Sequence, residues 1–309
     1  MATVDNPEGA VQRRAKRWLP RTMKRHGVRD GLIIGGLVIN GAFLAFLPTN
    51  FAWFVDAPAW WLIDLSNLYA GTSQSLTGVG AFRFAPVIAW LMWPLTLLPW
   101  AVFIATYLVL NLAAVVAMGR GRRGLVLIAA FPPVLLELLN ANIHLFMALA
   151  IWVGMRWPMA WSFLLLTKVT PGVGILWFAA RKEWRNLAIA LGATGAIAAI
   201  GFVIAPAQWT EWLRVLTTSA ALPQIGGLPP LLVRLPAAAL VVVFAARTDR
   251  AWLVPFACLL AMPTIWLQSA ALLTACFPLW WERGRWQRSA DPEPGSAGPA
   301  ARSLRGEAA

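Results

Sequence analysis

Residues 82–118 read FRFAPVIAWLMWPLTLLPWAVFIATYLVLNLAAVVAM, a run in which Arg83 is the only charged side chain. A membrane-spanning helix needs about 20 consecutive apolar residues, because a backbone polar group left unpaired in hydrocarbon is costly. Proline removes a helical hydrogen-bond donor, and Pro86, Pro94 and Pro99 interrupt the first half of the run. The stretch therefore predicts a short re-entrant or interfacial piece followed by one membrane span.

The composition of the whole chain agrees with this interpretation. Of its 309 residues, 59% are apolar and 13% are charged, whereas charged residues make up about 25% of a typical soluble domain. Ordinary cytosolic, disordered, collagen-like and disulfide-scaffold proteins are excluded. Cys258 and Cys276 both lie inside apolar segments and are expected to be small core residues.

Further apolar segments follow the same pattern. Residues 31–47 form the first clear span. The later segments are residues 124–138, 143–155, 157–167, 171–180, 185–205, 230–246, 251–262 and 264–281. Several are too short to cross a bilayer alone, so we expect them to pack around non-helical corners that protein covers. The sequence thus predicts an all-α polytopic membrane helical bundle with about ten crossings, several of them half-length helices.

Basic residues fix the expected orientation. The net charge is +13, and eight Lys and Arg residues fall within residues 1–30. Most of the others occupy short gaps between apolar segments, a distribution typical of membrane orientation and of contact with anionic lipid rather than of nucleic-acid binding. With residues 1–30 in the cytoplasm, alternation of the segments keeps nearly all Lys and Arg inside and predicts a multi-pass plasma membrane protein with both termini cytoplasmic.

Three regions follow from this layout. Residues 1–30 are a basic cytoplasmic N-terminus, and residues 31–281 form the transmembrane domain, with a first outer loop at residues 48–82. Residues 282–309 are rich in polar and turn-forming residues and are predicted to be a cytoplasmic disordered tail.

Polar residues converge on the outer face of this predicted bundle. An ionisable group at membrane depth costs about 2.5–3.5 kcal/mol on insertion scales, so such groups usually line a pathway or a site. The members of the set are Asp56, Asp64, Arg83, Glu137, Asn140, Asn142, His144, Lys168 and Gln224.

Each ionisable member also has a simpler interpretation. Asp56 and Asp64 fit solvated carboxylates of a Trp-rich interfacial helix, and Lys168 fits a lysine that extends to the head groups. Arg83 fits a head-group anchor, and His144 fits a helix cap or a core hydrogen bond. Glu137 is expected to be the structural partner of a nearby base.

Signatures of soluble enzymes are missing from the sequence. It contains no phosphate-binding glycine loop, no HExxH, no zinc-type Cys and His spacing and no serine nucleophile elbow. One of the two histidines lies in the basic N-terminus. We therefore expect no metal and no cofactor, and neither a soluble nucleotide-sugar enzyme nor an ATP-driven pump.

The order of several short motifs resembles glycosyltransferase family 87, from about residue 31 to residue 234. The motifs are DAPAWW at 56–61 with LY at 68–69, FRFAP at 82–86 with a Leu- and Pro-rich run to Pro99, ANIH at 141–144, and KVTP at 168–171 with RKEWR at 181–185. The third departs from the Gly-Gln-x-Asn of the family. A later outer loop of the family often carries Asn-Gln-Ser, and here only Gln224 matches that motif.

The resemblance implies a GT-C type fold and a membrane mannosyltransferase-like hexosyltransferase of the cell envelope. Such enzymes move a sugar, mannose by default, from a polyprenyl-phosphate donor to a glycolipid or polysaccharide hydroxyl on the outer face. Membrane lipid surrounds the site, and nucleic acid has no part in the reaction. A lipid or polyprenyl-phosphate transporter without catalysis is the alternative, and a scaffolding membrane protein is a third.

The resemblance also implies residue roles. A carboxylate must accept the proton of the attacking hydroxyl, and positive or donor groups must stabilise the departing phosphate. Asp56 aligns with the catalytic carboxylate of the family, and Asp64 is the second candidate. Arg83, Lys168, His144 and Asn142 are the candidates for the donor phosphate. Trp60, Trp61 and Gln224 are the candidates for contact with the sugar or the acceptor.

Overall fold

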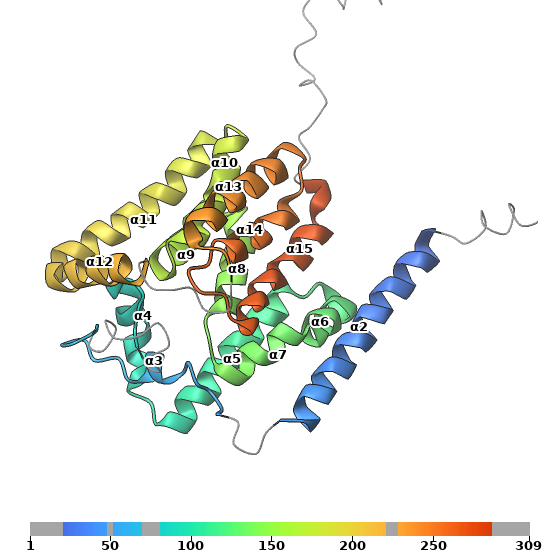
Figure 1. Ribbon diagram of the computed structural model, residues 1–309, viewed down its shortest axis with the longest axis horizontal. Helices are drawn as coiled ribbons and strands as arrows, with labels where there is room; N and C mark the ends of the chain where they lie inside the picture. Colours follow the sequence, from blue (N-terminus) through green and yellow to red (C-terminus); the bar gives the residue numbers. More distant parts are fainter. Residues whose placement is uncertain (1–20, 48–51, 70–80, 221–227, 286–309) are drawn as a thin grey trace, which may run out of the picture.

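The computed structural model describes residues 21–47, 52–69, 81–220 and 228–285, and within these ranges every regular element is a helix (Figure 1). The predicted all-α class is therefore confirmed for the described residues. The predictions for Gln224, for residues 1–20 and for residues 286–309 of the tail lie outside them. Helix α2 (Arg21–Ala45) begins before the predicted boundary at residue 31.

Full-length membrane helices are few among the described residues. The helices α2, α5 (Trp100–Met118) and α11 (Trp184–Ile204) each hold a stretch long and apolar enough to cross a bilayer. The pair α6 (Gly121–Ala130) and α7 (Pro132–Asn140) would add a fourth span, bent by 68°. The predicted figure of about ten crossings therefore depends on the shorter helices and stays a prediction.

Short helices build the interior, as the sequence suggested. Five apolar helical segments have 10–17 residues: α4 (Pro86–Thr96), α8 (His144–Gly154), η1 with α9 (Pro158–Thr167), η2 with α10 (Thr170–Ala180), and η3 with α14 (Ala251–Leu260). Helix α13 (Leu231–Arg247), η4 (Leu267–Ala275) and α15 (Cys276–Trp281) complete this part. Helix α8 packs on η4, and α14 packs on both α13 and η2.

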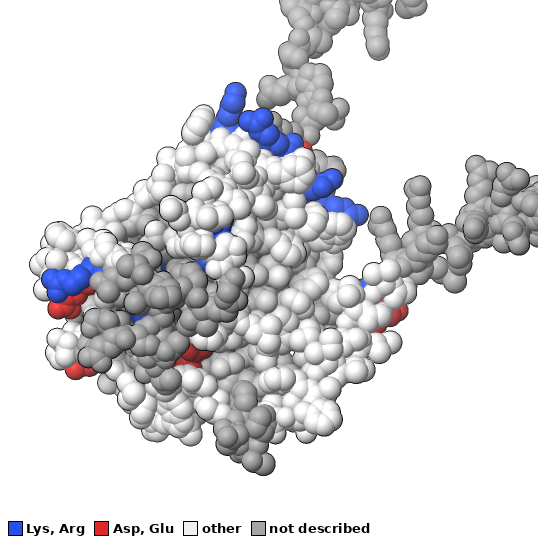
Figure 2. All heavy atoms as spheres, viewed as in Figure 1, with Lys and Arg blue, Asp and Glu red and all other residues white. Residues whose placement is uncertain are grey.

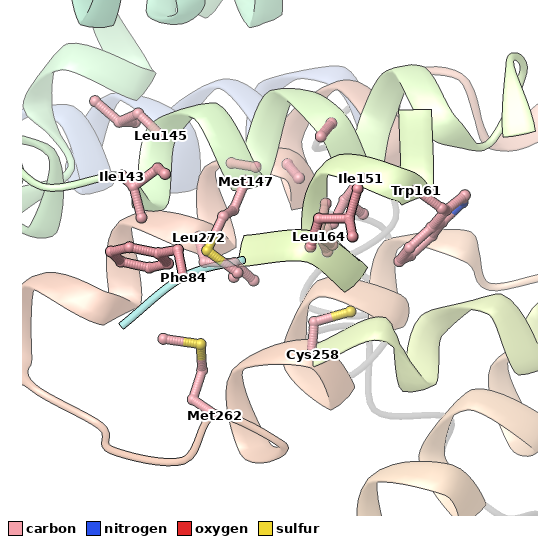
Figure 3. Packing of buried hydrophobic residues seen from close by; sticks show 14 of the residues in the cluster. Phe84, Ile143, Leu145, Met147, Ile151, Trp161, Leu164, Cys258, Met262 and Leu272 are labelled. Atoms are coloured by element: carbon pink, nitrogen blue, oxygen red, sulfur yellow. The ribbon is translucent and has the colours of Figure 1, made fainter. Parts of the chain in front are cut away.

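The core lies where these short helices meet. Figure 3 shows side chains of α8, α9, α14 and η4 in one cluster, among them Ile151, Trp161, Cys258 and Leu272, all fully buried. Burial of Cys258 confirms that this cysteine is a core residue. Lipid tails are as apolar as these side chains, so the short helices are held together chiefly by close van der Waals packing and by hydrogen bonds between them.

The structure differs from the sequence reading at two places. The predicted segment at residues 124–138 is bent into two helices: Phe131 has ψ 114°, which is extended backbone, because Pro132 disfavours the helical conformation in the residue before it. Between the predicted segments 185–205 and 230–246, where no element was predicted, lies α12 (Pro206–Ala220). Its Trp209 and Trp212 are buried and pack edge to face.

The turns of the bundle form two sets. The first set, the basic turns, consists of the turns near residues 156, 182, 249 and 283. Ion pairs join them in space: Arg156 Nη2 lies 2.6 Å from Glu282 Oε1, and Arg181 pairs with Asp249. Figure 2 shows Lys and Arg side chains gathered at the upper end of the molecule, where α10 and α13 end in Figure 1.

The second set, the opposite turns, consists of the turns near residues 142, 168 and 262. Figure 3 shows Phe84, Ile143 and Met262 toward one side of the view and Trp161 toward the other. The chain alternates between the two sets of turns. Helix α8 runs from the opposite turn near residue 142 to the basic turn near residue 156, and α9 runs back to the opposite turn near residue 168. The segment η2 with α10 then leads to the basic turn near residue 182. This alternation matches the order of segments on which the predicted orientation was based.

Helix α2 docks on the rest of the bundle through its small residues. It contacts α6 and α7 and is otherwise exposed, with Figure 1 showing it along one edge. Gly36 faces the backbone of Ala130 so closely that an added Cβ would collide with the carbonyl oxygen, and Asn40 Nδ2 donates to the same oxygen at 3.3 Å. The neighbouring Gly35 has open space around it.

We predict that the same substitution at these two glycines changes the free energy of unfolding in opposite directions. Gly35→Ala should raise the free energy of unfolding by about 0.5–1 kcal/mol, the usual gain from replacing a helical glycine. Gly36→Ala should instead lower it by about 1–3 kcal/mol, because the new methyl group forces α2 away from α6. Thermal unfolding in the same micelles measures both, and equal shifts would contradict this docking.

Candidate functional site

The site begins at the C-terminal end of α7. The last carbonyl groups of a helix have no partner within it, and here Ala141 ends the helix in the left-handed conformation, with φ 53 and ψ 53. The segment at residues 52–69 supplies the missing donors. The backbone N–H of Phe54 donates to the carbonyl oxygen of Leu139 at 2.8 Å, and that of Asp56 donates to Asn140 at 3.1 Å. The loop is thereby fixed to the helix end.

This attachment places Asp56 beside Asn142. Asn142 Nδ2 donates to Asp56 Oδ2 at 2.5 Å, and Asn142 Oδ1 accepts the backbone N–H of Ile143 at 2.7 Å. The hydroxyl of Tyr107 donates to the Asn142 carbonyl oxygen at 3.0 Å. The amide orientation is thus set from both sides, and Asp56 Oδ1 makes no hydrogen bond to the described residues. That half-buried oxygen can accept a proton.

A second carboxylate, that of Glu137, lies on the last turn of α7. Glu137 is 1% exposed, its Oε1 accepts the backbone N–H of His144 at 2.5 Å, and its Oε2 lies 2.9 Å from His144 Nδ1. The expectation that Glu137 partners a nearby base is confirmed. The imidazole is 1% exposed, and its Nε2 lies 3.4 Å from Lys168 Nζ.

Lys168 brings a cation to the same place. It follows the last residue of α9, at the corner that the sequence predicted between two short helices. Burial lowers the pKa of Lys168 to about 8, although the charges of Asp56 and Glu137 act to raise it, and Arg83 adds to the lowering. The contact between Lys168 and His144 joins the motif at residues 168–171 to the motif at residues 141–144, and so brings the base of one motif to the turn that holds Asp56 and Glu137.

Arg83 reaches this cluster through a backbone contact. The N–H of Ala85 donates to the carbonyl oxygen of Leu166 at 2.9 Å, which joins the FRFAP stretch to the end of α9. Desolvation lowers the pKa of Arg83. A guanidinium group remains charged in proteins despite such a shift, so Arg83 and Lys168 together offer two positive groups to an anion.

An aromatic cluster supports the segment that carries Arg83. Trp60 is 2% exposed and stacks on Phe84 with ring centroids 4.6 Å apart, and the Tyr69 hydroxyl donates to the Phe84 carbonyl oxygen at 2.7 Å. Trp61 Nε1 donates to the Leu98 carbonyl oxygen at 2.9 Å. The structure therefore gives Trp60 a packing role, and its contact with the sugar stays a prediction.

Asp64 lies apart from these hydrogen bonds. Its carboxylate is exposed, and Oδ1 accepts both the backbone N–H and the hydroxyl of Ser66, at 2.9 and 2.6 Å. These bonds lower the pKa of Asp64. Such an Asx turn satisfies the carboxylate locally. Of the two aspartates, Asp56 is the one that contacts the turn at residue 142.

Tyr107 is a member of the site that sequence reasoning missed. It lies within α5 and is 1% exposed. The chain has two tyrosines, and both donate their hydroxyl to a backbone carbonyl near the cluster. A phenol in the middle of an apolar span was a usable signal, because a buried hydroxyl needs a partner.

The left-handed residue of the α7–α8 turn gives a direct test of this geometry. An L-residue in that conformation costs about 1–2 kcal/mol, so Ala141→Gly should stabilise the protein by about 0.5–1 kcal/mol after the entropy of the unfolded chain is subtracted. Ala141→Val should destabilise it, since a β-branched residue strongly disfavours this conformation.

The same pair of variants reports on the Asp56 contact. With cysteines at positions 56 and 142 in a background lacking Cys258 and Cys276, a short thiol-reactive linker should join the two sites efficiently in Ala141→Gly. The yield should fall in Ala141→Val, because the turn that carries Asn142 is displaced. Equal yields and equal unfolding temperatures would show that Ala141 does not control the turn.

Comparison with known proteins bears on this arrangement. The model of glycosyltransferase family 87 matches residues 82–291. Arg83, Asn142, His144 and Lys168 lie inside the matched range, whereas Asp56 precedes it and joins it through the hydrogen bonds to Asn140 and Asn142. No curated protein and no solved structure matches the chain. Because the match covers most of a helical membrane chain, this protein belongs to glycosyltransferase family 87.

Proposed function

We propose that this glycosyltransferase moves a hexose, with mannose as the first choice, from a polyprenyl-phosphate sugar to an acceptor hydroxyl at the end of the bundle that carries the opposite turns. The observation that carries the proposal is that one turn holds both Asp56 and Lys168: Asn142 donates to Asp56 at 2.5 Å, and His144 lies 3.4 Å from Lys168 Nζ. The bond from Ala85 to Leu166 brings the segment that carries Arg83 to the same end of α9. A proton acceptor and an anion-binding group are the two components that this transfer requires.

The proposed reaction exchanges one bond for another at the anomeric carbon of the sugar. The bond from this carbon to the phosphate oxygen breaks, and the phosphate leaves with the electron pair. The acceptor oxygen forms the new bond, and its proton passes to Oδ1 of Asp56. Asn142 orients Asp56 through Oδ2, so the other oxygen is the one that faces the incoming hydroxyl in this mechanism.

Charge explains how the donor is held. The phosphodiester of the donor carries one negative charge, and the leaving phosphate monoester develops a second. Arg83 and Lys168 bind the phosphate in both states and stabilise it more as its charge grows. His144 and Asn142 border the same cluster as hydrogen-bonding groups. Trp60, Trp61 and Gln224 remain the proposed contacts of the sugar or the acceptor.

The two sets of turns support one orientation in the membrane. Arg156, Arg181 and Arg283 belong to the basic turns, and Lys and Arg are retained on the cytoplasmic side of membrane proteins. With the basic turns on the cytoplasmic side of the plasma membrane, the Asp56 cluster lies at the outer face, where a glycolipid or polysaccharide acceptor is available. The corners between short helices let the prenyl chain of the donor approach from the bilayer.

Replacement of Asp56 is the primary test of catalysis. Asp56→Asn keeps an oxygen that can accept from Asn142 but removes the base, so transfer should fall by about 10²–10⁴-fold, the usual contribution of a general base. Asp64→Asn is the matched control and should retain activity within about twofold, because Asp64 bonds only within its own turn. The measurement is transfer of label from polyprenyl-phosphate mannose to native lipid extract by purified protein in liposomes.

The outcomes separate the possibilities. Loss in Asp56→Asn with Asp64→Asn active, at equal unfolding temperatures, supports the assignment. Equal activity of both variants would remove Asp56 as the base. If the wild type moves the labelled lipid across the bilayer without transferring sugar, the chain is acting as a transporter and the proposed reaction is wrong.

The lowered pKa of Lys168 predicts a pH dependence. Below a pKa of about 8 the ammonium is charged and binds the donor phosphate, and above it the amine is neutral. The kcat/KM for the donor should therefore fall as pH rises through about 8, because this parameter reports groups of the free enzyme.

Lys168→Arg tests whether Lys168 causes this decline of kcat/KM at high pH. A guanidinium group keeps its charge through this pH range, so the decline should disappear or move beyond about pH 10. Lys168→Met should have a low kcat/KM for the donor at every pH, because it has no charge at this position. A wild-type decline that is unchanged in Lys168→Arg would assign the titration to another group.

A further inference from the structure

We propose that Glu137 is a positioning residue that sets the tautomer of His144, so that His144 Nε2 accepts a hydrogen bond from Lys168 and holds that ammonium group in the donor-binding cluster. The inference rests on the proposed function for its effect on sugar transfer. The tautomer itself is a property of the folded chain and can be measured without any substrate.

The contacts of Glu137 decide where the imidazole proton lies. Oε1 accepts the backbone N–H of His144 at 2.5 Å, and Oε2 lies 2.9 Å from Nδ1. An ionised carboxylate can only accept hydrogen bonds. Nδ1 therefore carries the proton, and Nε2 presents its lone pair on the opposite side of the ring.

Lys168 completes the chain of hydrogen bonds on that side. An ammonium group has three donors and no acceptor, and Nζ lies 3.4 Å from Nε2. With Nδ1 protonated, every contact from Glu137 through His144 to Lys168 pairs a donor with an acceptor. With Nε2 protonated, an N–H group would point at the ammonium group and repel it.

The other charges of the cluster favour the same state. A shifted arrangement, with a neutral Glu137 donating to Nδ1 and a neutral Lys168 accepting from Nε2–H, would also satisfy the hydrogen bonds. It would place an uncharged amine beside Asp56 and beside the phosphate of the donor. Burial and the charge of Arg83 favour the neutral amine, and the charge of Asp56 favours the ammonium form, which prevails at pH 7 because the pKa of Lys168 is about 8.

Burial makes this arrangement rigid. Both Glu137 and His144 are 1% exposed, and Glu137 lies on α7 while His144 begins α8. Water cannot replace a lost partner at such a site, so a buried donor or acceptor strongly retains its own. The pair consequently acts as a fixed support under Lys168, whose long side chain would otherwise sample several rotamers.

Glu137→Gln is the informative change because the side chain keeps its size. The amide oxygen can still accept from the backbone N–H of His144, but the amide nitrogen now donates toward Nδ1. The imidazole must then carry its proton on Nε2, which faces Lys168. The variant therefore alters the tautomer while preserving the packing, and a similar exchange in serine proteases leaves geometry intact while lowering kcat.

Nitrogen NMR reads this tautomer directly. The chain has two histidines, so His26→Gln leaves His144 as the sole reporter. With histidine labelled in ¹⁵N and ¹³C and the protein in liposomes at pH 7, the proposal predicts a protonated Nδ1 and an unprotonated Nε2. In the same background Glu137→Gln should exchange the two signals. A wild-type histidine protonated on Nε2, or on both nitrogens, overturns the proposal, as does an unchanged tautomer in Glu137→Gln.

Sugar transfer supplies the functional half of the test. Glu137→Gln should lower kcat about 10–100-fold, the range found when a partner that orients a ligating histidine is removed, with the acceptor KM within about twofold. Glu211→Gln makes the same chemical change at an exposed position of α12 and should behave as wild type. Unaltered kcat in Glu137→Gln would show that the tautomer has no role in transfer.

A coupled variant distinguishes positioning from loss of structure. In a Lys168→Met background, Glu137→Gln should lower kcat by less than about twofold further, because both changes act through the same ammonium group. A full additional loss would mean that Glu137 acts by another route. If the wild type transfers no sugar at all, the proposed function fails, and the NMR result still decides the tautomer independently.

Discussion

Two unpaired carbonyl groups at the end of α7 determine how the site is assembled. A helix end inside an apolar protein must find donors for its last carbonyls, and here the donors are the backbone N–H groups of Phe54 and Asp56. The segment that carries Asp56 is therefore held by main-chain bonds that depend little on its side chains. Asp56 arrives beside Asn142 as a consequence, and the left-handed Ala141 turns the chain toward α8 at that point.

The same turn allows charge to exist within an apolar bundle. Isolated charges at this depth are strongly disfavoured, and buried ion pairs are tolerated only when their remaining polar atoms are also bonded. Glu137 meets this condition with both oxygens occupied by His144. His144 in turn lies 3.4 Å from Lys168 Nζ, so an added phosphate would meet a cation that is already held in place.

The sequence predicted some features well and others poorly, for identifiable reasons. Short apolar segments predicted the bounds of α8 and of η2 with α10 closely, because hydropathy and proline mark helix ends. The bend at Phe131 followed from Pro132 and could have been read from the sequence. Helix α12 was missed because its amphipathic pattern is less apolar than a span. The preference for Asp56 over Asp64 depends on contacts at residues 140 and 142, far away in sequence, and no local pattern encodes it.

Membership in glycosyltransferase family 87 and the geometry of the Asp56 cluster meet in one claim, that the donor phosphate binds beside Lys168 and Arg83. The most direct measurement is an electron cryo-microscopy map of the protein in nanodiscs with polyprenyl phosphate bound. The account predicts phosphate density within hydrogen-bonding distance of Lys168 and Arg83, with room for a sugar toward Asp56. Phosphate density at the basic turns, with none at Lys168 and Arg83, would contradict it.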